Sequence, residues 1–163
     1  GDAAIGLLAH QNKITLADEE KRFCIERLNR PTPRLKIGQA LINCATSMID
    51  CSDGFAADLG HILQASDIGA EVTFASLPLS FAGNNWIKTG ENPELIINGG
   101  DDYELIFTAP TQAAYEIKKI ASELNVTITC VGSTTQTKGL RIYDAEDRVM
   151  SLTDVGYNHF TNH

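Results

Sequence analysis

Apolar residues recur along this chain with two different spacings. In five stretches they return every three or four positions, which predicts amphipathic helices over residues 1–11, 15–29, 37–45, 55–63 and 113–124. Thr15 with Asp18 fits a capping box at the start of the second stretch, and Thr32 is suited to cap the third. The last stretch has the clearest helical pattern, because its apolar positions form a single stripe.

Shorter apolar or alternating runs, bounded by turn residues, predict strands. They cover residues 47–50, 70–77, 94–97, 103–110, 126–132, 140–144 and 148–152, the last two joined by the hairpin sequence AEDR. Helices and strands mixed in this order indicate an α+β fold. We expect helices packed on a mixed, mainly antiparallel sheet of about four to six strands.

The chain has 163 residues, of which 43% are hydrophobic, and this is enough to bury one core. Its net charge of −8 argues against nucleic acid as a partner, because binding a phosphate backbone requires clustered Lys and Arg. No apolar run approaches the roughly 20 residues that cross a bilayer, so we expect no membrane association. The cysteines show no zinc-ligand spacing, and we interpret them as reduced thiols of a cytoplasmic protein; they are Cys24, Cys44, Cys51 and Cys130.

An acidic turn, DCSDG, stands where a predicted strand meets a predicted helix. Asp50 and Asp53 lie three residues apart, with Ser52 and Gly54 beside the second. One interpretation is structural, with Asp53 or Ser52 capping the helix. The other is functional, because backbone N–H groups at such a turn can point at an anion. Two carboxylates would repel a polyphosphate, by about 1 kcal/mol per contact at ~4 Å in water, but Mg²⁺ reverses that sign by binding carboxylate and phosphate oxygens together.

A second acidic turn has the sequence NGGDDYEL. Gly99 and Gly100 permit backbone angles closed to other residues, so a ligand can come close to the main chain, and Asp101 and Asp102 follow at once. A plain turn made of good turn formers explains the same residues. Two turns of glycine and acid, each next to an apolar run, nevertheless favour a shared site for a metal-bound nucleotide. The histidines, His61 included, show no metal-ligand spacing and are assigned to the surface or to packing.

Taken together, these motifs are similar to those of a known family. The segments GDAAIGL, RPTPR, IDCSDGFAADLGHIL, GAEV, LPLS, GGDDYELIFT and GYNHF occur in this order. Their order resembles that in the C-terminal half of the bacterial thiamine-monophosphate kinase family, within the superfamily of aminoimidazole ribonucleotide synthetase and selenide, water dikinase. The resemblance runs from about Gly1 to Phe160, nearly the whole chain.

The resemblance implies an activity and a set of site residues. Family members transfer the γ-phosphoryl group of ATP to thiamine monophosphate, giving thiamine diphosphate and ADP, with Mg²⁺ ions. By motif match, Asp50 and Asp53 are Mg²⁺ ligands and Ser52 contacts ATP. Asp101 and Tyr157 match positions that contact thiamine monophosphate. No residue is assigned as catalytic in its own right, because the phosphoryl group passes directly between the substrates.

The resemblance also bears on domain organisation. It implies that residues 1–163 are a single C-terminal domain of a two-domain kinase, whose N-terminal ATP- and metal-binding domain lies outside this chain. The chain starts at Gly1 without a methionine, which agrees with a piece of a longer protein. We expect the full-length enzyme to be a homodimer and this part alone to fold without catalysing. Asp101 where Glu is common, and Asn158 where Asp is common, leave the details of substrate contact open.

Other functions stay open as alternatives. One is a related ATP-dependent enzyme of the same superfamily with another acceptor. The other is a non-catalytic module that binds a divalent metal ion. A haloacid-dehalogenase-type phosphotransferase is disfavoured, because it needs a nucleophilic aspartate in a DxD arrangement and DCSD has a different spacing.

Overall fold

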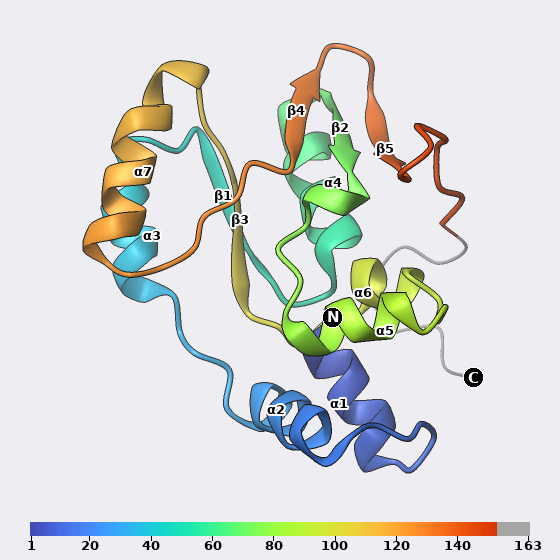
Figure 1. Ribbon diagram of the computed structural model, residues 1–163. Coiled ribbons are helices and arrows are strands. Elements are labelled where there is room, and N and C mark those ends of the chain that lie inside the picture. The colour runs from blue at the N-terminus through green and yellow to red at the C-terminus, as the bar shows by residue number, and fades with distance from the viewer. Residues whose placement is uncertain (153–163) are drawn as a thin grey trace.

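The computed structural model describes residues 1–152 of the chain (Figure 1). In this part the elements follow in the order α1 (Asp2–His10), α2 (Asp18–Asn29), α3 (Leu35–Leu41), β1 (Ser47–Cys51), α4 (Phe55–Ser66), β2 (Gly69–Thr73), α5 (Phe81–Lys88), α6 (Glu94–Asn98), β3 (Glu104–Thr108), α7 (Ala114–Glu123), β4 (Gly132–Thr135) and β5 (Gly139–Tyr143). Short 3-10 helices lie at Phe74–Ser76 and Thr111–Ala113. Among residues 1–152, no helix combines the length and the apolar character needed to cross a membrane.

The strands form two small sheets. β1 pairs with β3 in antiparallel fashion, while β2 lies between an antiparallel β4 and a parallel β5. The predicted α+β class and the mixed, mainly antiparallel pairing are confirmed, although the strands do not join into one sheet. In Figure 1 the ribbon of β1 and β3 crosses the middle of the molecule, with α3 and α7 on one side and α4 with the three-stranded sheet on the other.

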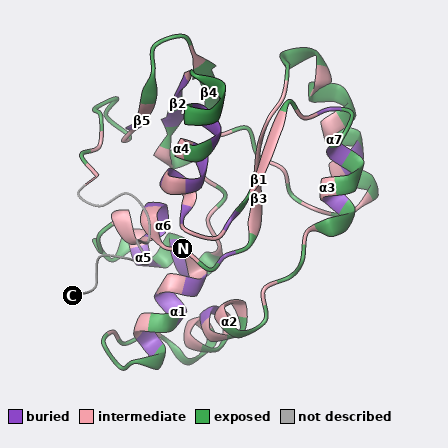
Figure 2. Ribbon diagram, turned by 180° about the vertical axis from the view of Figure 1, so that it is seen from behind, coloured by how far each residue is buried: buried purple, intermediate pink, exposed green. Residues whose placement is uncertain are grey.

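The described residues form three hydrophobic clusters, two of which include residues of the β1–β3 ribbon. One lies between α4 and the three-stranded sheet, one among α1, α2, α5 and α6, and one between α3 and α7. Their buried members include, in that order, Leu59, Val72 and Ile142; Ile5, Cys24 and Trp86; and Leu41, Cys44 and Ile120. Figure 2 shows buried and exposed positions alternating along α3, α4 and α7, which is typical of amphipathic helices that each cover one core.

The side chains of β3 alternate between two of these clusters. Ile106 packs against the α4 cluster, whereas Leu105 and Phe107 pack against the α3–α7 cluster. Successive side chains of a strand point to opposite faces, so the ribbon is a wall shared by both cores. Its register pairs Cys51 with Glu104, and this pair ends the ribbon where the two acidic turns begin.

Residues 94–98 form helix α6, so the strand predicted there is wrong. The side-chain Oδ1 of Asn92 accepts the N–H of Glu94 at 2.9 Å, and Pro93 is the N-cap of the helix. A local side-chain bond of this kind turns the backbone before strand pairing can begin. The apolar residues Ile96 and Ile97 are buried from a helix instead.

Three other predictions need correction at their edges. The strand predicted at 126–132 joins a sheet only from Gly132, because the preceding segment passes between the α3–α7 and α4 clusters. The strand at 148–152 reduces to one antiparallel bridge between Tyr143 and Val149, although the AEDR hairpin is present. Helices α2 and α3 have Ala17 and Arg34 as N-caps, so neither Thr15 nor Thr32 caps a helix.

Candidate functional site at two acidic turns

The two acidic turns lie side by side at the end of the β1–β3 ribbon. The N–H of Asp101 donates to the carbonyl of Ser52 at 2.9 Å, and the N–H of Tyr103 donates to the carbonyl of Cys51 at 2.8 Å. A Cβ added at Gly100 would lie 2.4 Å from the carbonyl oxygen of Ser52, so only glycine permits this approach of the two backbones. Two motifs that are well separated in the sequence therefore meet.

Gly54 fixes the first turn against the residue that opens the second. Its φ is 118°, and a Cβ there would lie 2.5 Å from the carbonyl oxygen of Asn98. Helix α4 begins directly after Gly54, so Gly54 itself occupies the N-cap position. The expectation that Asp53 or Ser52 caps this helix is therefore wrong.

Asp58, in the first turns of α4, satisfies the backbone of the acidic turn instead. Its Oδ2 accepts the N–H groups of Ser52, Asp53 and Gly54 at 2.9, 2.9 and 3.1 Å. The residue is only 2% exposed, and hydrogen bonds to an ionised acceptor are the stronger kind. The prediction that these N–H groups face an incoming anion is wrong, because a carboxylate of the chain itself already accepts them.

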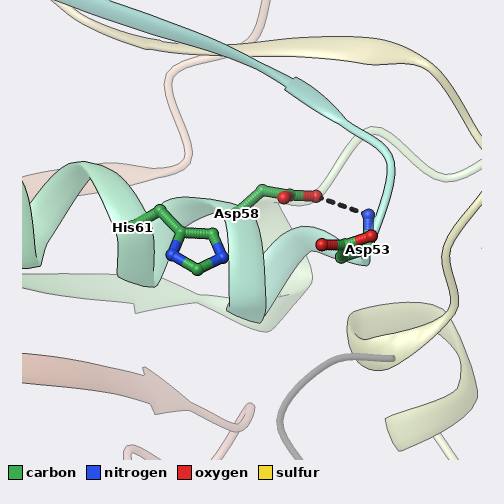
Figure 3. A group of neighbouring side chains, drawn as sticks. All are labelled: Asp53, Asp58 and His61. Atoms are coloured by element: carbon green, nitrogen blue, oxygen red, sulfur yellow. Dashed lines mark hydrogen bonds between the residues drawn. The ribbon is translucent and has the colours of Figure 1, made fainter. Parts of the chain in front are cut away.

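Asp58 also belongs to a group of possible metal ligands (Figure 3). One ligand atom each from Asp53, Asp58 and His61 lies within 4.8 Å of the other two. Asp58 and His61 are three residues apart on α4 and so share a helix face. Assigning His61 to the surface or to packing alone overlooked this spacing. Two carboxylates and an imidazole form a donor set that fits a divalent cation.

The other predicted site acids are exposed. Asp50 lies near the end of β1, opposite Leu105, and does not belong to the group drawn in Figure 3. Asp101 lies in the neighbouring turn with a φ of 67°. Within residues 1–152, no Lys or Arg forms an ion pair with Asp50, Asp53 or Asp101. Three carboxylates are therefore available to cations at this end of the ribbon.

The remaining acids of the second turn are engaged within the protein. Asp102 is 8% exposed and accepts the N–H of Ala3 at 3.1 Å, which ties the turn to α1. Glu104 accepts Nε and Nη2 of Arg34 at 2.7 and 2.6 Å and Nη2 of Arg27 at 2.8 Å. The sequence pattern indicated neither arginine, because both come from the distant α2–α3 region.

Two tyrosines also bear on the site. Tyr103 was not predicted to take part, yet it has a φ of 50° and is 42% exposed. A positive φ is an outlier for a bulky residue, and such strain clusters at functional sites. Tyr157, the predicted contact of thiamine monophosphate, lies outside the described residues, as does Asn158.

The fold and the paired turns place the chain in a known class. The family model described as AIR synthase related protein, C-terminal domain, matches residues 6–145, and this chain therefore belongs to that family. The matched range includes both acidic turns. The superfamily expected from the motifs is confirmed.

Matches to individual proteins point to one enzyme family within this class. Thiamine-monophosphate kinase of Escherichia coli (strain K12) is 39% identical over 162 residues, which are 98% of this chain and 50% of that protein. Thiamine-monophosphate kinase of Haemophilus influenzae is 42% identical over 132 residues, covering 81% of this chain and 40% of that protein. The chain spans about half the length of the curated relatives it matches.

Solved structures agree with the sequence relatives. The crystal structure of thiamine-monophosphate kinase from Stenotrophomonas maltophilia K279a superposes with a TM-score of 0.78 at 35% identity, over 87% of this chain and 46% of that chain. AaThiL complexed with AMPPCP and TMP gives a TM-score of 0.77 at 27% identity, over 98% of this chain and 48% of that chain. The resemblance to the thiamine-monophosphate kinase family is thus confirmed in both sequence and fold.

Proposed function

We propose that this chain is the C-terminal domain of a cytoplasmic thiamine-monophosphate kinase. Together with an N-terminal domain, it transfers the γ-phosphoryl group of ATP to thiamine monophosphate. The similarity to kinases of that name supports the proposal. So does the similar structure that holds AMPPCP and TMP, which correspond in this proposal to the nucleotide and the acceptor.

One observation in the chain itself carries the proposal: the two turns are joined by backbone hydrogen bonds, and Asp50, Asp53 and Asp101 have no Lys or Arg partner within residues 1–152. Carboxylates on adjoining turns repel one another. The arrangement becomes favourable when divalent cations and phosphate oxygens share it, because Mg²⁺ takes ligands from both. Carboxylates without a Lys or Arg partner are free to bind the cations of a metal-bound nucleotide.

Each predicted site residue has a role in this proposal. Asp50 and Asp53 would hold Mg²⁺, and a carboxylate oxygen of Asp58 lies within 4.8 Å of one of Asp53, which supports a cation with oxygen ligands there. When bound, Mg²⁺ supplies neutralisation of the charge on the phosphates. Ser52, between the two aspartates, is assigned to ATP. Because Asp58 already accepts the N–H groups of the turn, the phosphates would depend on cations and side chains here rather than on those N–H groups.

In this proposal the γ-phosphoryl group passes directly from ATP to thiamine monophosphate, without a covalent enzyme intermediate. A phosphate oxygen of thiamine monophosphate attacks the γ-phosphorus of ATP, and the bond from that phosphorus to the β,γ-bridging oxygen breaks. The electron pair leaves on ADP, and the acceptor becomes thiamine diphosphate. The protein contributes alignment and charge. Asp101 and Tyr157 are assigned to the acceptor, since a carboxylate and an aromatic ring both attract its cationic thiazolium.

The proposal makes residues 1–163 one half of the enzyme. An N-terminal domain is expected to complete the nucleotide site and to form a homodimer. The matched relatives, of which the chain covers about half, support the existence of a further domain. The half described here is expected to fold but not to catalyse alone.

The full-length protein that contains this chain tests the proposal. It is titrated calorimetrically with Mg-ATP and with thiamine monophosphate, and ADP release is followed. We expect both ligands to bind and ADP to form only when the acceptor is present. Binding of Mg²⁺ without any response to nucleotide or acceptor would favour a metal-binding module. Turnover with a different acceptor only would favour a related enzyme of the superfamily.

Asp53→Ala tests the metal assignment in the same protein. We expect turnover to fall about 100-fold, the size of effect seen when one transition-state stabiliser is removed. The melting temperature should barely change, because the Asp53 side chain has no ion pair within residues 1–152. Glu91→Ala, at an exposed acid between α5 and α6, is the matched control and should leave turnover unchanged. An unaltered rate of Asp53→Ala at saturating Mg²⁺ would remove the assignment.

A further inference from the structure

Two arginines from outside the acidic turns meet at Glu104. Arg27 comes from α2, and Arg34 from the end of the RPTPR connection before α3. Arg34 binds Glu104 through two parallel contacts of 2.7 and 2.6 Å, and Arg27 adds a third of 2.8 Å. The arginine side chains are only 17% and 25% exposed, and a forked, partly shielded pair is stronger than an ordinary surface ion pair.

Arg27 makes a second contact within the acidic turn. The same Nη2 that reaches Glu104 also donates to the carbonyl of Asp102 at 3.2 Å. Asp102 and Glu104 are the two neighbours of Tyr103 in the sequence. One guanidinium therefore fixes the chain on both sides of that residue.

The fixed segment is the one with unfavourable backbone angles. Asp101 and Tyr103 have φ values of 67° and 50°, in the left-handed region that L-residues avoid, bulky ones most of all. On one side, their N–H groups bond to the carbonyls of Ser52 and Cys51. On the other side, the contacts of Arg27 and Glu104 described above oppose a return to ordinary angles, together with the bond between the Asp102 carboxylate and the N–H of Ala3.

We propose that Arg27 and Arg34 are positioning residues: through Glu104 they hold Asp101–Tyr103 in left-handed geometry and thereby set where the Asp101 carboxylate meets the acceptor. The identity of the acceptor rests on the proposed function. The arrangement itself, here named the Glu104 clamp (Arg27, Arg34 and Glu104), is a property of this chain and can be tested without the reaction. Neither arginine is a catalytic residue, because each acts through Glu104.

A purely structural role for these ion pairs predicts something different. If the Glu104 clamp only joined α2 to β3, its loss would lower stability and the amount of active protein, while the KM values of the remaining enzyme stayed unchanged. If the clamp positions Asp101, its loss raises the KM for the acceptor and leaves the KM for Mg-ATP nearly unchanged. The split between the two KM values separates the roles.

The kinetic experiment compares Arg34→Met and Arg34→Lys in the full-length protein. We expect Arg34→Met to raise the KM for thiamine monophosphate about tenfold, equal to about 1.4 kcal/mol, with the KM for Mg-ATP within about twofold. Arg34→Lys should recover part of the loss, because it keeps the charge but not the fork. Arg30→Met is the matched control, since Arg30 is 80% exposed and pairs only loosely, at 3.8 Å, with Glu26 on the same helix.

A second readout does not depend on the reaction. The NMR backbone chemical shifts of Asp101 and Tyr103 report left-handed geometry in the unliganded protein, and we expect them to move in Arg34→Met and Glu104→Gln but not in Arg30→Met. Unchanged shifts in folded Arg34→Met and Glu104→Gln would overturn the clamp, as would an unchanged KM for the acceptor in active Arg34→Met. If the wild-type protein had no activity on thiamine monophosphate, the proposed function would fail, while the shifts would still decide the clamp.

Discussion

The two acidic turns adjoin each other, yet they are stabilised in different ways. The first is stabilised from within, because Asp58 follows it on α4 and accepts three of its N–H groups. The second is stabilised from outside. Its Asp102 bonds to α1, and its Glu104 bonds to Arg27 and Arg34, which lie 77 and 70 residues away in the sequence.

This difference separates the proposed roles as well. The turn with the predicted metal ligands is a local unit of strand, turn and helix, and it can form wherever that unit forms. The turn with the predicted acceptor contact needs α1, α2 and the connection to α3 in place before its backbone angles are fixed. Distant substitutions should therefore affect the acceptor side and leave the metal side intact.

The largest expected effect comes from removing the Asp58 carboxylate, which stabilises the unit of β1, the first acidic turn and α4. Asp58→Ala would leave three buried or half-buried N–H groups without their acceptor, and each such group costs about 1–3 kcal/mol. We expect the free energy of unfolding, measured by urea denaturation, to fall by about 3–5 kcal/mol. Asp58→Asn keeps an acceptor oxygen and should lose less. A loss below about 1 kcal/mol in Asp58→Ala would show that the first turn does not depend on Asp58.

A smaller effect probes the contact between the turns. Gly54→Ala combines a φ of 118° with a Cβ only 2.5 Å from the Asn98 carbonyl oxygen, so we expect it to destabilise the protein by about 2–3 kcal/mol. Gly60→Ala, on the same helix with no atom within 4 Å of the added Cβ, should stabilise it by up to about 1 kcal/mol. Opposite signs in thermal denaturation support the contact, and equal signs would contradict it.

The smallest expected effect is a difference in the rate at which thiols near the two turns are labelled. Burial raises the pKa of the Cys51 thiol, at the first turn, to about 12, and it does the same for Cys24 in α2. At pH 8 both thiols therefore stay protonated and react slowly, whereas exposed Cys130 should be labelled first by iodoacetamide. Mass spectrometry of the labelled peptides gives the order. In Asp58→Ala we expect faster labelling of Cys51 but not of Cys24, and equal acceleration of both would mean that the whole fold had loosened.

Local patterns were sufficient to predict the first turn. The apolar run before Asp50 and the helical spacing after Gly54 predict β1 and α4, and both are present. What local reasoning missed was the use of the N–H groups. Asp58 stands at a spacing from which a carboxylate can reach back to the start of its own helix, and the i, i+3 spacing to His61 was equally visible in the sequence.

The second turn could not be predicted to the same depth. Nothing in the sequence near Glu104 names Arg27 or Arg34 as its partners, because ion pairs between distant segments leave no periodic pattern. The apolar run ELII before the turn predicts a strand, whereas the side-chain bond from Asn92 favours a helix there. The secondary structure of that segment therefore depends on a local side-chain bond as well as on its apolar pattern.

The pairing register of β1 and β3 determines both the packing of two hydrophobic clusters and the alignment of the two acidic turns. Because Ile106 faces one core and Leu105 with Phe107 face the other, a shift of one residue in the pairing would exchange the two sets and leave both cores badly filled. The same shift would break the hydrogen bond between Asp101 and Ser52 and separate the two acidic turns at the end of the ribbon. A shifted register would therefore destabilise two hydrophobic clusters at once. The register that fills both clusters is also the one that aligns the two acidic turns.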